Sequence, residues 1–188
     1  MKKPFLIGIA GGSSSGKSTF CDVLEKSLSS FKLKILHMDD YFKPEEKRPY
    51  VEAPINGIMY IDDNHPETVD LIQLKIDMFQ ALEKDFYVII IEGLLTLWDK
   101  EICSRLDLKL FVDCRSDERI VRRLRRNMGW GLSFDEISNV YLDMVRYRHD
   151  EFVEPTKWKA DIILNGSNPS TIALSAIVEF VEKACSQT

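Results

Sequence analysis

Residues 11–18 form a glycine-rich loop of the kind that holds the phosphates of a nucleotide. They read Gly-Gly-Ser-Ser-Ser-Gly-Lys-Ser, which fits the pattern G-x-x-x-x-G-K-[ST] in full. An apolar run at residues 5–10 precedes the loop, and an amphipathic stretch at residues 19–28 follows it. Strand, loop and helix in this order are the context that the motif requires, and a chance match in a Gly/Ser loop would not explain it.

The residue types in the loop suit the binding of ATP. Glycine at positions 11 and 16 tolerates backbone angles that a β-carbon forbids, so the loop amides can point inward at anionic oxygens. The following helix adds its positive end. Lys17, which we expect to face solvent in the empty loop, would place its charge on the β- and γ-phosphates, and the Ser18 hydroxyl would ligate Mg²⁺. The expected ATP-binding residues are Gly11, Gly12, Ser13, Ser14, Ser15, Gly16, Lys17, Ser18 and Thr19.

Acidic residues follow three later apolar runs. Asp39 and Asp40 follow the second run of the chain, Glu92 the third and Asp113 the fourth. Because ligands bind at the carboxyl ends of parallel strands, we expect these side chains near the loop. Phosphoryl transfer needs Mg²⁺ and a carboxylate that takes the proton of the acceptor hydroxyl. Asp39 suits the proton, and Glu92 suits the metal, directly or through water. Asp40 and Asp113 could instead cap the helices that follow, and we favour that role for Asp113.

A group of arginines lies on one face of an expected helix. They are Arg119, Arg122, Arg123 and Arg126, with Arg125 beside them. Clustered guanidinium groups suit the negative charge of a phosphoryl group in transfer, which is the role we favour. The alternative is a solvated basic face that pairs with Asp117 and Glu118.

Strands and helices alternate along the chain, and this order positions the residues above. We expect strands at residues 5–10, 33–38, 86–91, 108–112 and 160–164. We expect helices at residues 19–28, 67–83, 117–126, 134–151 and 169–184. Strands this apolar, alternating with helices, indicate an α/β fold with a doubly wound parallel sheet and helices on both faces. Residues 1–188 would form a single domain.

Two segments depart from the alternation. Residues 43–66 are rich in proline and charge, and Asn56-Gly57 within them predicts a type I′ hairpin. Long insertions are usually functional, so we expect this hairpin to wall an acceptor pocket, although a decorative surface hairpin is the alternative. Residues 127–133 contain two glycines around Trp130, which suits a short mobile lid.

The composition is that of a cytoplasmic enzyme. The 188 residues carry a net charge of −5, which argues against nucleic acid or an acidic membrane as a general partner. The four cysteines are widely spaced and favour free thiols over disulfides or zinc. No stretch is long and apolar enough to span a membrane. These features leave a homo-oligomer open.

The motifs resemble those of uridine kinases. The residues that carry the resemblance are Gly11 to Ser18, Asp39-Asp40-Tyr41-Phe42, Asn64-His65-Pro66, Ile91-Glu92-Gly93, Phe111-Val112-Asp113, Arg122-Arg123 with Arg126, and Phe152-Val153-Glu154-Pro155-Thr156-Lys157 with Ala160-Asp161-Ile162-Ile163. They span residues 4–166, and the stretch from Glu154 to Ile163 is the most specific. The family belongs to the phosphoribulokinase/uridine kinase group of P-loop kinases, which includes nicotinamide riboside kinases. The segment Asp39 to Pro44 looks closer to the nicotinamide riboside kinases.

The resemblance implies roles for the matching positions. Asp39 would be the general base and would complete a magnesium shell with Ser18 and Glu92. Lys17, Arg123 and Arg126 would steady the transferring phosphoryl group. The substrate contacts expected on this basis, with the acids that leave the insertion, are Asp39, Phe42, Asp62, Asp63, Asn64 and Arg123.

The chain departs from the family pattern at its acceptor side. Uridine kinases have Asp before His-Pro, where it binds the ribose hydroxyls, and Asn64 stands there in this chain. An amide binds a diol more weakly than a carboxylate does. The family's lid carries Arg-Gly-Arg, whereas Trp130 and Leu132 flank the glycine here, and the segment after Glu92-Gly93 offers Trp98 as its one aromatic residue.

The sequence thus favours transfer of a phosphoryl group from Mg-ATP to the 5′-hydroxyl of a ribonucleoside. Uridine or cytidine is the first expected acceptor, and nicotinamide riboside is the second. A regulatory P-loop protein that binds nucleotide without phosphorylating a small molecule is the alternative from another class. The chain has no Asn-Lys-x-Asp motif for guanine, and Asp39 stands where an acceptor base is needed. A sugar or pantothenate-type kinase of the same fold also stays open. The choice of base, ATP against GTP as donor, and the oligomeric state are not determined by these features.

Overall fold

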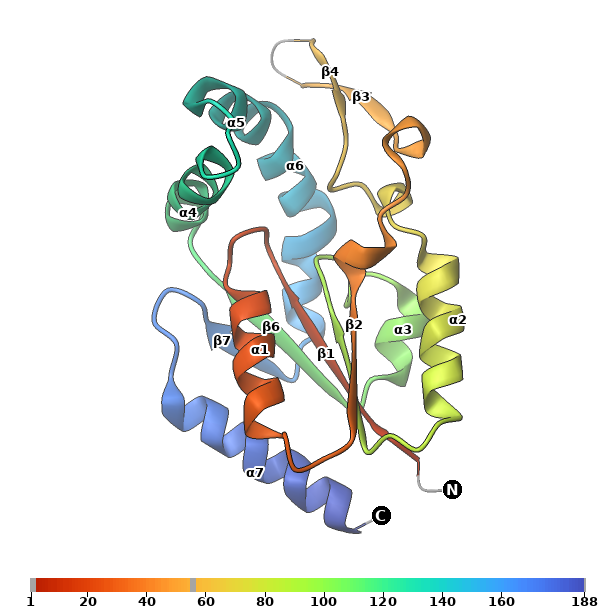
Figure 1. Cartoon of the computed structure of the whole chain (residues 1–188). Helices are drawn as coiled ribbons and strands as arrows, with labels where there is room; N and C mark the ends of the chain where they lie inside the picture. The colour runs from red at the N-terminus through yellow and green to blue at the C-terminus, as the bar shows by residue number, and fades with distance from the viewer. Residues whose placement is uncertain (1–2, 55–56, 188) are drawn as a thin grey trace.

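A five-stranded parallel sheet forms the centre of the molecule, with strand order β2-β5-β1-β6-β7 (Figure 1). The computed structural model describes residues 3–54 and 57–187. The strands are β1 (Phe5–Gly11), β2 (Leu33–His37), β5 (Val88–Glu92), β6 (Leu108–Asp113) and β7 (Ile162–Asn165). Because β1 lies in the middle, the loop that follows it has the ends of β5 and β6 on either side.

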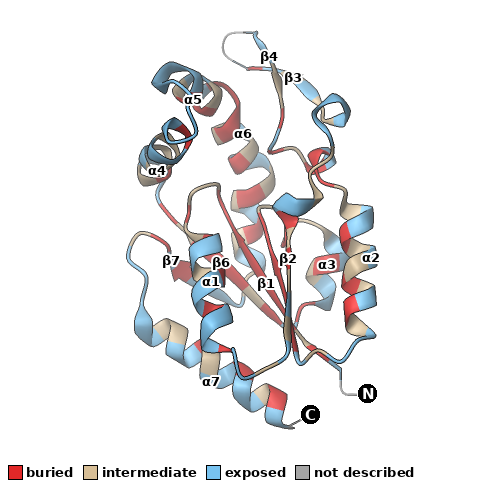
Figure 2. Ribbon diagram, viewed as in Figure 1, coloured by how far each residue is buried: buried red, intermediate tan, exposed pale blue. Residues whose placement is uncertain are grey.

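Helices cover both faces of this sheet. One face carries α1 (Lys17–Ser27) and α7 (Thr171–Gln187), and the other carries α2 (Leu71–Leu82) and α3 (Lys100–Arg105). Side chains alternate along each strand, so Leu6 and Ala10 enter one core while Ile7 and Ile9 enter the other. The three central strands, β1, β5 and β6, are accordingly buried through most of their length, whereas the edge strands β2 and β7 are more exposed (Figure 2). Among the described residues, no helix is long and apolar enough to cross a membrane.

The predicted doubly wound sheet is confirmed, but one helix starts later than predicted. We expected a helix over residues 67–83, and α2 begins at Leu71. A 3₁₀ turn occupies Pro66–Thr68, and Val69 forms a β-bridge with Phe42. The Asp70 carboxylate then accepts a hydrogen bond from a backbone amide of the first helical turn and caps α2.

The insertion contains an antiparallel pair, β3 (Tyr50–Glu52) with β4 (Met59–Ile61). The Ala53 amide donates to the Ile58 carbonyl at 2.8 Å and continues the pairing beyond the two strands. The type I′ turn at Asn56-Gly57 stays a prediction, because Ile55 and Asn56 lie outside the described residues. Gly57 itself has φ of +69°.

Part of the segment that we predicted to be a lid, residues 127–133, is helical. Its first two residues form the end of α4 (Ser116–Met128), and a capping box at Ser133 starts α5 (Phe134–Val140). The helical chain then continues through α6 (Arg146–Arg148) and two π-helical turns as far as Val153. Only residues 129–132 therefore connect two helices.

Helix α3 was not predicted. The Asp99 carboxylate accepts from two backbone amides, those of Glu101 and Ile102, and so caps the helix. The helix has six residues, which is too few for a periodic apolar pattern to stand out in the sequence.

Candidate functional site

The glycine-rich loop has backbone angles that few residues other than glycine adopt. Gly11 has φ of +150° and Gly16 has φ of +101°. A β-carbon on Gly11 would lie 2.5 Å from the Val112 carbonyl oxygen, so the loop needs glycine there on steric grounds as well. The hydroxyls of Ser14 and Ser15 are buried and have no hydrogen-bond partner among the described residues. Bound anionic oxygens would give these hydroxyls acceptors, which fits a phosphate-binding loop.

The Glu92 carboxylate, at the end of β5, contacts three side chains. It is buried, at 4 % exposure, and accepts a hydrogen bond from the Ser18 hydroxyl at 3.1 Å. The ammonium group of Lys17 lies 3.6 Å from the same oxygen, and Nδ1 of His37 lies 2.9 Å from the other oxygen. Our expectation that Lys17 faces solvent is therefore wrong, because the side chain is buried against Glu92.

The donor set beside the loop suits a hard cation. A hydroxyl from Ser18 and a carboxylate from Glu92 lie together, and Mg²⁺ prefers oxygen ligands of this kind. No group of three or more metal-binding acidic, histidine or cysteine side chains occurs among the residues that the structure describes. In nucleotide-dependent Mg²⁺ sites generally, the protein supplies one or two ligands, and phosphates and water supply the rest.

Asp39 lies beyond the end of its strand. Strand β2 ends at His37, and Asp39 and Asp40 are exposed within a 3₁₀ turn at Met38–Tyr41. The buried Met38 side chain packs so closely over residue 93 that a β-carbon there would lie 2.2 Å from the Met38 Cβ, so glycine is required. This contact holds the turn against the end of β5, with Asp39 open to an acceptor.

Arg123 and Arg126 lie close together and close to the acids and the loop. Arg123 donates a hydrogen bond to the Ser13 hydroxyl at 3.1 Å. Burial lowers the pKa of Arg123 and so does the charge of Arg126, whereas the Asp63 carboxylate opposes the shift. Burial also lowers the pKa of Arg126, against the charge of Asp39. Guanidinium groups stay charged at neutral pH, so these two cations, which repel each other, would gain from an anion between them.

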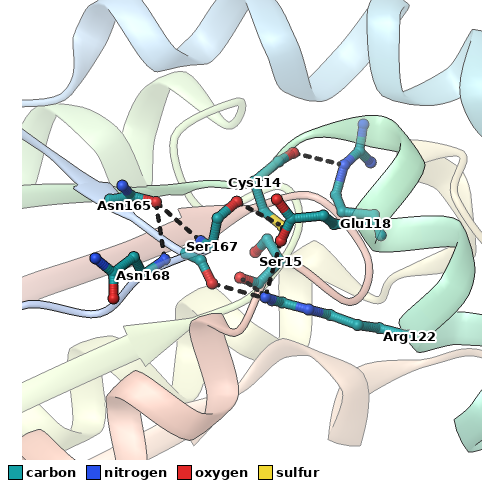
Figure 3. Close-up of polar contacts among 9 residues, drawn as sticks. Ser15, Cys114, Glu118, Arg122, Asn165, Ser167 and Asn168 are labelled. Atoms are coloured by element: carbon teal, nitrogen blue, oxygen red, sulfur yellow. Dashed lines mark hydrogen bonds and ion pairs between the residues drawn. The ribbon is translucent and has the colours of Figure 1, made fainter.

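Two of the other three arginines of this helix, Arg119 and Arg122, contact backbone carbonyls near the loop, whereas Arg125 is exposed. Arg122 donates to the carbonyls of Ser15 at 3.4 Å and Gly166 at 3.0 Å, and it pairs with Glu118 (Figure 3). Arg119 is buried and donates to the Cys114 carbonyl. Only Arg122 thus forms the pair with Glu118 that a solvated basic face would show.

We predicted that Asp113 caps the helix that follows it, and this prediction is wrong. Arg115 occupies the N-cap position of α4 and makes no side-chain cap hydrogen bond. Asp113 instead accepts from Lys157 at 3.4 Å, and Lys157 also pairs with Glu154. The carboxylate therefore ties the end of β6 to the segment before β7.

A largely apolar cavity of about 620 Å³ opens beside the loop. Its lining includes Gly16, Thr19 and Phe20 from the start of α1, Arg122 from α4, and Gly166 with Leu174 from the turn into α7. Such a cavity, next to a phosphate-binding loop and apolar in lining, can receive a planar base.

On the acceptor side, Asp62 is fully buried and has structural partners. Its carboxylate accepts from Arg148 Nε at 2.6 Å and from the backbone N–H of Asn64 at 3.0 Å. Our expectation that Asp62 contacts a sugar is not supported by this arrangement. Asn64 itself is buried, at 7 % exposure.

Asp63 and Phe42 share a partner in Arg48. The guanidinium donates to the Asp63 carboxylate at 2.9 Å and lies 5.3 Å from the centre of the Phe42 ring. The charge of Asp63 also acts on Arg123, so this acid lies toward the phosphate side. Asp63 and Phe42 are thereby brought to one region.

Three comparisons place these features among known proteins. The sequence model described as the phosphoribulokinase / uridine kinase family matches residues 64–173. A uridine kinase of Clostridium botulinum (strain Kyoto / Type A2) is 32 % identical over 198 residues, covering 95 % of this chain and 96 % of that protein.

The chain belongs to the phosphoribulokinase/uridine kinase family.

Solved structures agree in fold. A putative fructose transport system kinase from Silicibacter sp. TM1040 superposes with a TM-score of 0.64 at 16 % identity, covering 87 % of this chain and 90 % of that chain. A possible uridine kinase from Bacillus stearothermophilus gives 0.52 at 19 % identity, with 87 % and 89 % covered. The predicted family and the predicted P-loop kinase fold are both confirmed.

Sequence reasoning missed three side chains that contact the predicted site residues. His37 contacts Glu92, Arg148 neutralises Asp62, and Arg48 joins Asp63 to the Phe42 ring. The place of His37 at a strand end, two residues before Asp39, was a usable signal. The partners of Arg48 and Arg148 depend on how the insertion folds back, which no local pattern reveals.

Proposed function

We propose that the protein transfers a phosphoryl group from Mg-ATP to the 5′-hydroxyl of a ribonucleoside, with uridine or cytidine as the first candidates. The observation that carries the proposal is the meeting of the phosphate loop, the Ser18–Glu92 pair and the exposed Asp39 at one edge of the sheet. Relatives named uridine kinase, matched over nearly the whole chain, support the choice of acceptor.

The donor would lie along the loop and the neighbouring cavity. The phosphates would accept hydrogen bonds from the loop amides and from the orphaned hydroxyls of Ser14 and Ser15. The base would enter the apolar cavity beside Thr19 and Phe20. Mg²⁺, when bound to Ser18 and Glu92, would neutralise the charge that develops on the phosphate oxygens.

The acceptor would be activated by Asp39. Its carboxylate would take the proton of the attacking hydroxyl, and Lys17 would place its charge on the transferring group. Arg123 and Arg126 would stabilise the same charge from the opposite side, since both are already held near the loop and the acids. Asp63, Asn64 and Phe42 would contact the nucleoside.

Nicotinamide riboside is the second acceptor, supported by the likeness of residues 39–44 to kinases of that substrate. Asn64 stands where uridine kinases have a ribose-binding carboxylate. Because uridine, cytidine and nicotinamide riboside all carry ribose, this difference does not favour one of these acceptors over another. A regulatory role without phosphotransfer has less support, because a non-catalytic protein has no need of an exposed carboxylate beside the phosphate loop.

The direct test is an acceptor panel. The protein is incubated with Mg-ATP and, separately, with uridine, cytidine, nicotinamide riboside, pantothenate and several sugars, and products are identified by mass spectrometry. We expect a monophosphate of uridine or cytidine. A phosphorylated sugar or vitamin without any nucleotide product would contradict the proposal, and ATP binding without any product would favour the regulatory role.

A further inference from the structure

His37 occupies a position in the site to which the proposed reaction assigns no role. It is the last residue of β2, and Glu92 is the last residue of the adjacent strand β5. The two residues are register partners in the parallel sheet, so their side chains leave the same edge side by side. The result is a 2.9 Å contact between Nδ1 of His37 and Oε2 of Glu92.

The two carboxylate oxygens of Glu92 have different partners. Oε2 is held by His37, whereas Oε1 faces the Ser18 hydroxyl at 3.1 Å and the Lys17 ammonium at 3.6 Å. A carboxylate offers only lone pairs, so Nδ1 carries the hydrogen and donates it. Glu92 is therefore fixed about its terminal torsion, with Oε1 directed at the phosphate loop.

We propose that His37 is a positioning residue for the metal carboxylate: it orients Glu92 so that Oε1, beside Ser18, is presented to nucleotide-bound Mg²⁺. This proposal rests on the proposed function insofar as Glu92 is taken as a magnesium ligand. Carboxylates that bind metals are themselves held by hydrogen bonds, and loss of such a partner typically costs about 10- to 100-fold in metal affinity. His37 also lies two residues before Asp39, so the same side chain links the turn that carries the general base to the metal carboxylate.

The test measures metal affinity without turnover. Mn²⁺, a paramagnetic substitute for Mg²⁺, is titrated into the protein–ADP complex and free Mn²⁺ is followed by electron paramagnetic resonance. The variants are His37→Ala, which removes the donor, and His37→Asn, whose amide nitrogen can replace Nδ1. Lys34→Ala, an exposed change on the same strand, is the matched control. ADP affinity in the presence of a chelator and thermal unfolding are measured for each variant.

We expect His37→Ala to weaken Mn²⁺ binding about 10-fold or more, with metal-free ADP affinity unchanged. His37→Asn should recover most of the loss, and Lys34→Ala should match the wild type. Should His37→Ala fail to fold, His37→Leu fills the site without a donor and is expected to show the same weakening. Mn²⁺ affinity equal to the wild type in the donor-less variant would overturn the proposal, even in a protein that phosphorylates nucleosides. Absence of nucleoside phosphorylation in the wild type would instead count against the proposed function alone.

Discussion

At the scale of single residues, Glu92 is the centre of the site. Its carboxylate is nearly inaccessible to solvent, so its charge depends on Lys17, Ser18 and His37 for compensation. Bound nucleotide would compete for two of these partners, because phosphates attract Lys17 and a metal attracts Ser18. Glu92 and its three partners thus compensate one another's charge and polarity within the protein.

This pairing gives Lys17→Ala two separable effects. Phosphotransfer should be almost abolished, because the charge on the transferring group is lost. The free energy of unfolding should also fall by about 1–3 kcal/mol, because a buried carboxylate loses one of its partners. Steady-state kinetics and denaturant unfolding measure the two effects. The double variant Lys17→Ala/Glu92→Gln should regain stability without regaining activity, and unchanged turnover in Lys17→Ala would contradict the role of the loop.

Asn64 allows the acceptor sugar to be tested. Asn64→Asp restores the carboxylate found in uridine kinases at a buried position, where a ribose diol would supply two hydroxyl donors. A hydrogen bond to a charged group is worth about 1.5–3 kcal/mol, so the preference for a ribonucleoside over its 2′-deoxy counterpart should rise about tenfold or more. The ratio of kcat/KM for the two substrates measures this. An unchanged ratio would indicate that the acceptor is not held by its ribose diol.

Among the helices, strands and loops, those with a strong local sequence pattern could be predicted. The glycine-rich loop could be predicted because its backbone angles require glycine at fixed positions. The strands could be predicted because buried parallel strands are continuous apolar runs in the sequence. The start of α2 could not, because Val69 pairs with Phe42 across the insertion, and this distant contact overrides local helix propensity. The burial of Asp62 was missed for the same reason, since its partner lies 86 positions away.

The pair Asp62–Arg148 should therefore stabilise the exit of the insertion and not contact the acceptor. Asp62→Asn should lower the free energy of unfolding by about 1–3 kcal/mol, because Arg148 loses a charged hydrogen-bond acceptor but keeps its pair with Glu151. The KM for the acceptor should change no more than the KM for ATP. Chemical denaturation and steady-state kinetics measure these quantities. A selective rise in the KM for the acceptor, with the free energy of unfolding unchanged, would contradict this structural role and indicate that Asp62 contacts the substrate.

The connection between α4 and α5 positions Arg126. The guanidinium lies 5.0 Å from the centre of the exposed Trp130 ring and donates to the Asn127 side chain. An exposed cation–π contact is worth about 0.5–1 kcal/mol, so Trp130→Ala should lower kcat about two- to fivefold. Trp158→Ala, which removes another exposed indole, should leave kcat unchanged. Equal kcat in both variants and the wild type would show that Trp130 does not position Arg126.

At the scale of the whole molecule, the parallel sheet explains how distant residues meet. The loop after β1, Asp39 after β2 and Glu92 at the end of β5 come from three different parts of the chain, and all leave the same edge of the sheet. Helix α4 brings Arg123 to that edge, where it bonds the loop directly. One edge of the sheet therefore carries the loop, the two acids and Arg123 together.

In the proposed reaction, Asp39 activates a nucleoside 5′-hydroxyl for attack on ATP. The most direct measurement is the rate of uridine monophosphate formation by the wild type and by Asp39→Asn, with 5′-deoxyuridine as the matched acceptor that lacks the hydroxyl. We expect product from uridine and none from 5′-deoxyuridine. Asp39→Asn should bind ATP normally and turn over about 10²- to 10⁴-fold more slowly, because it cannot accept the proton. Phosphorylation of 5′-deoxyuridine, or a rate in Asp39→Asn within a few-fold of the wild type, would contradict the account.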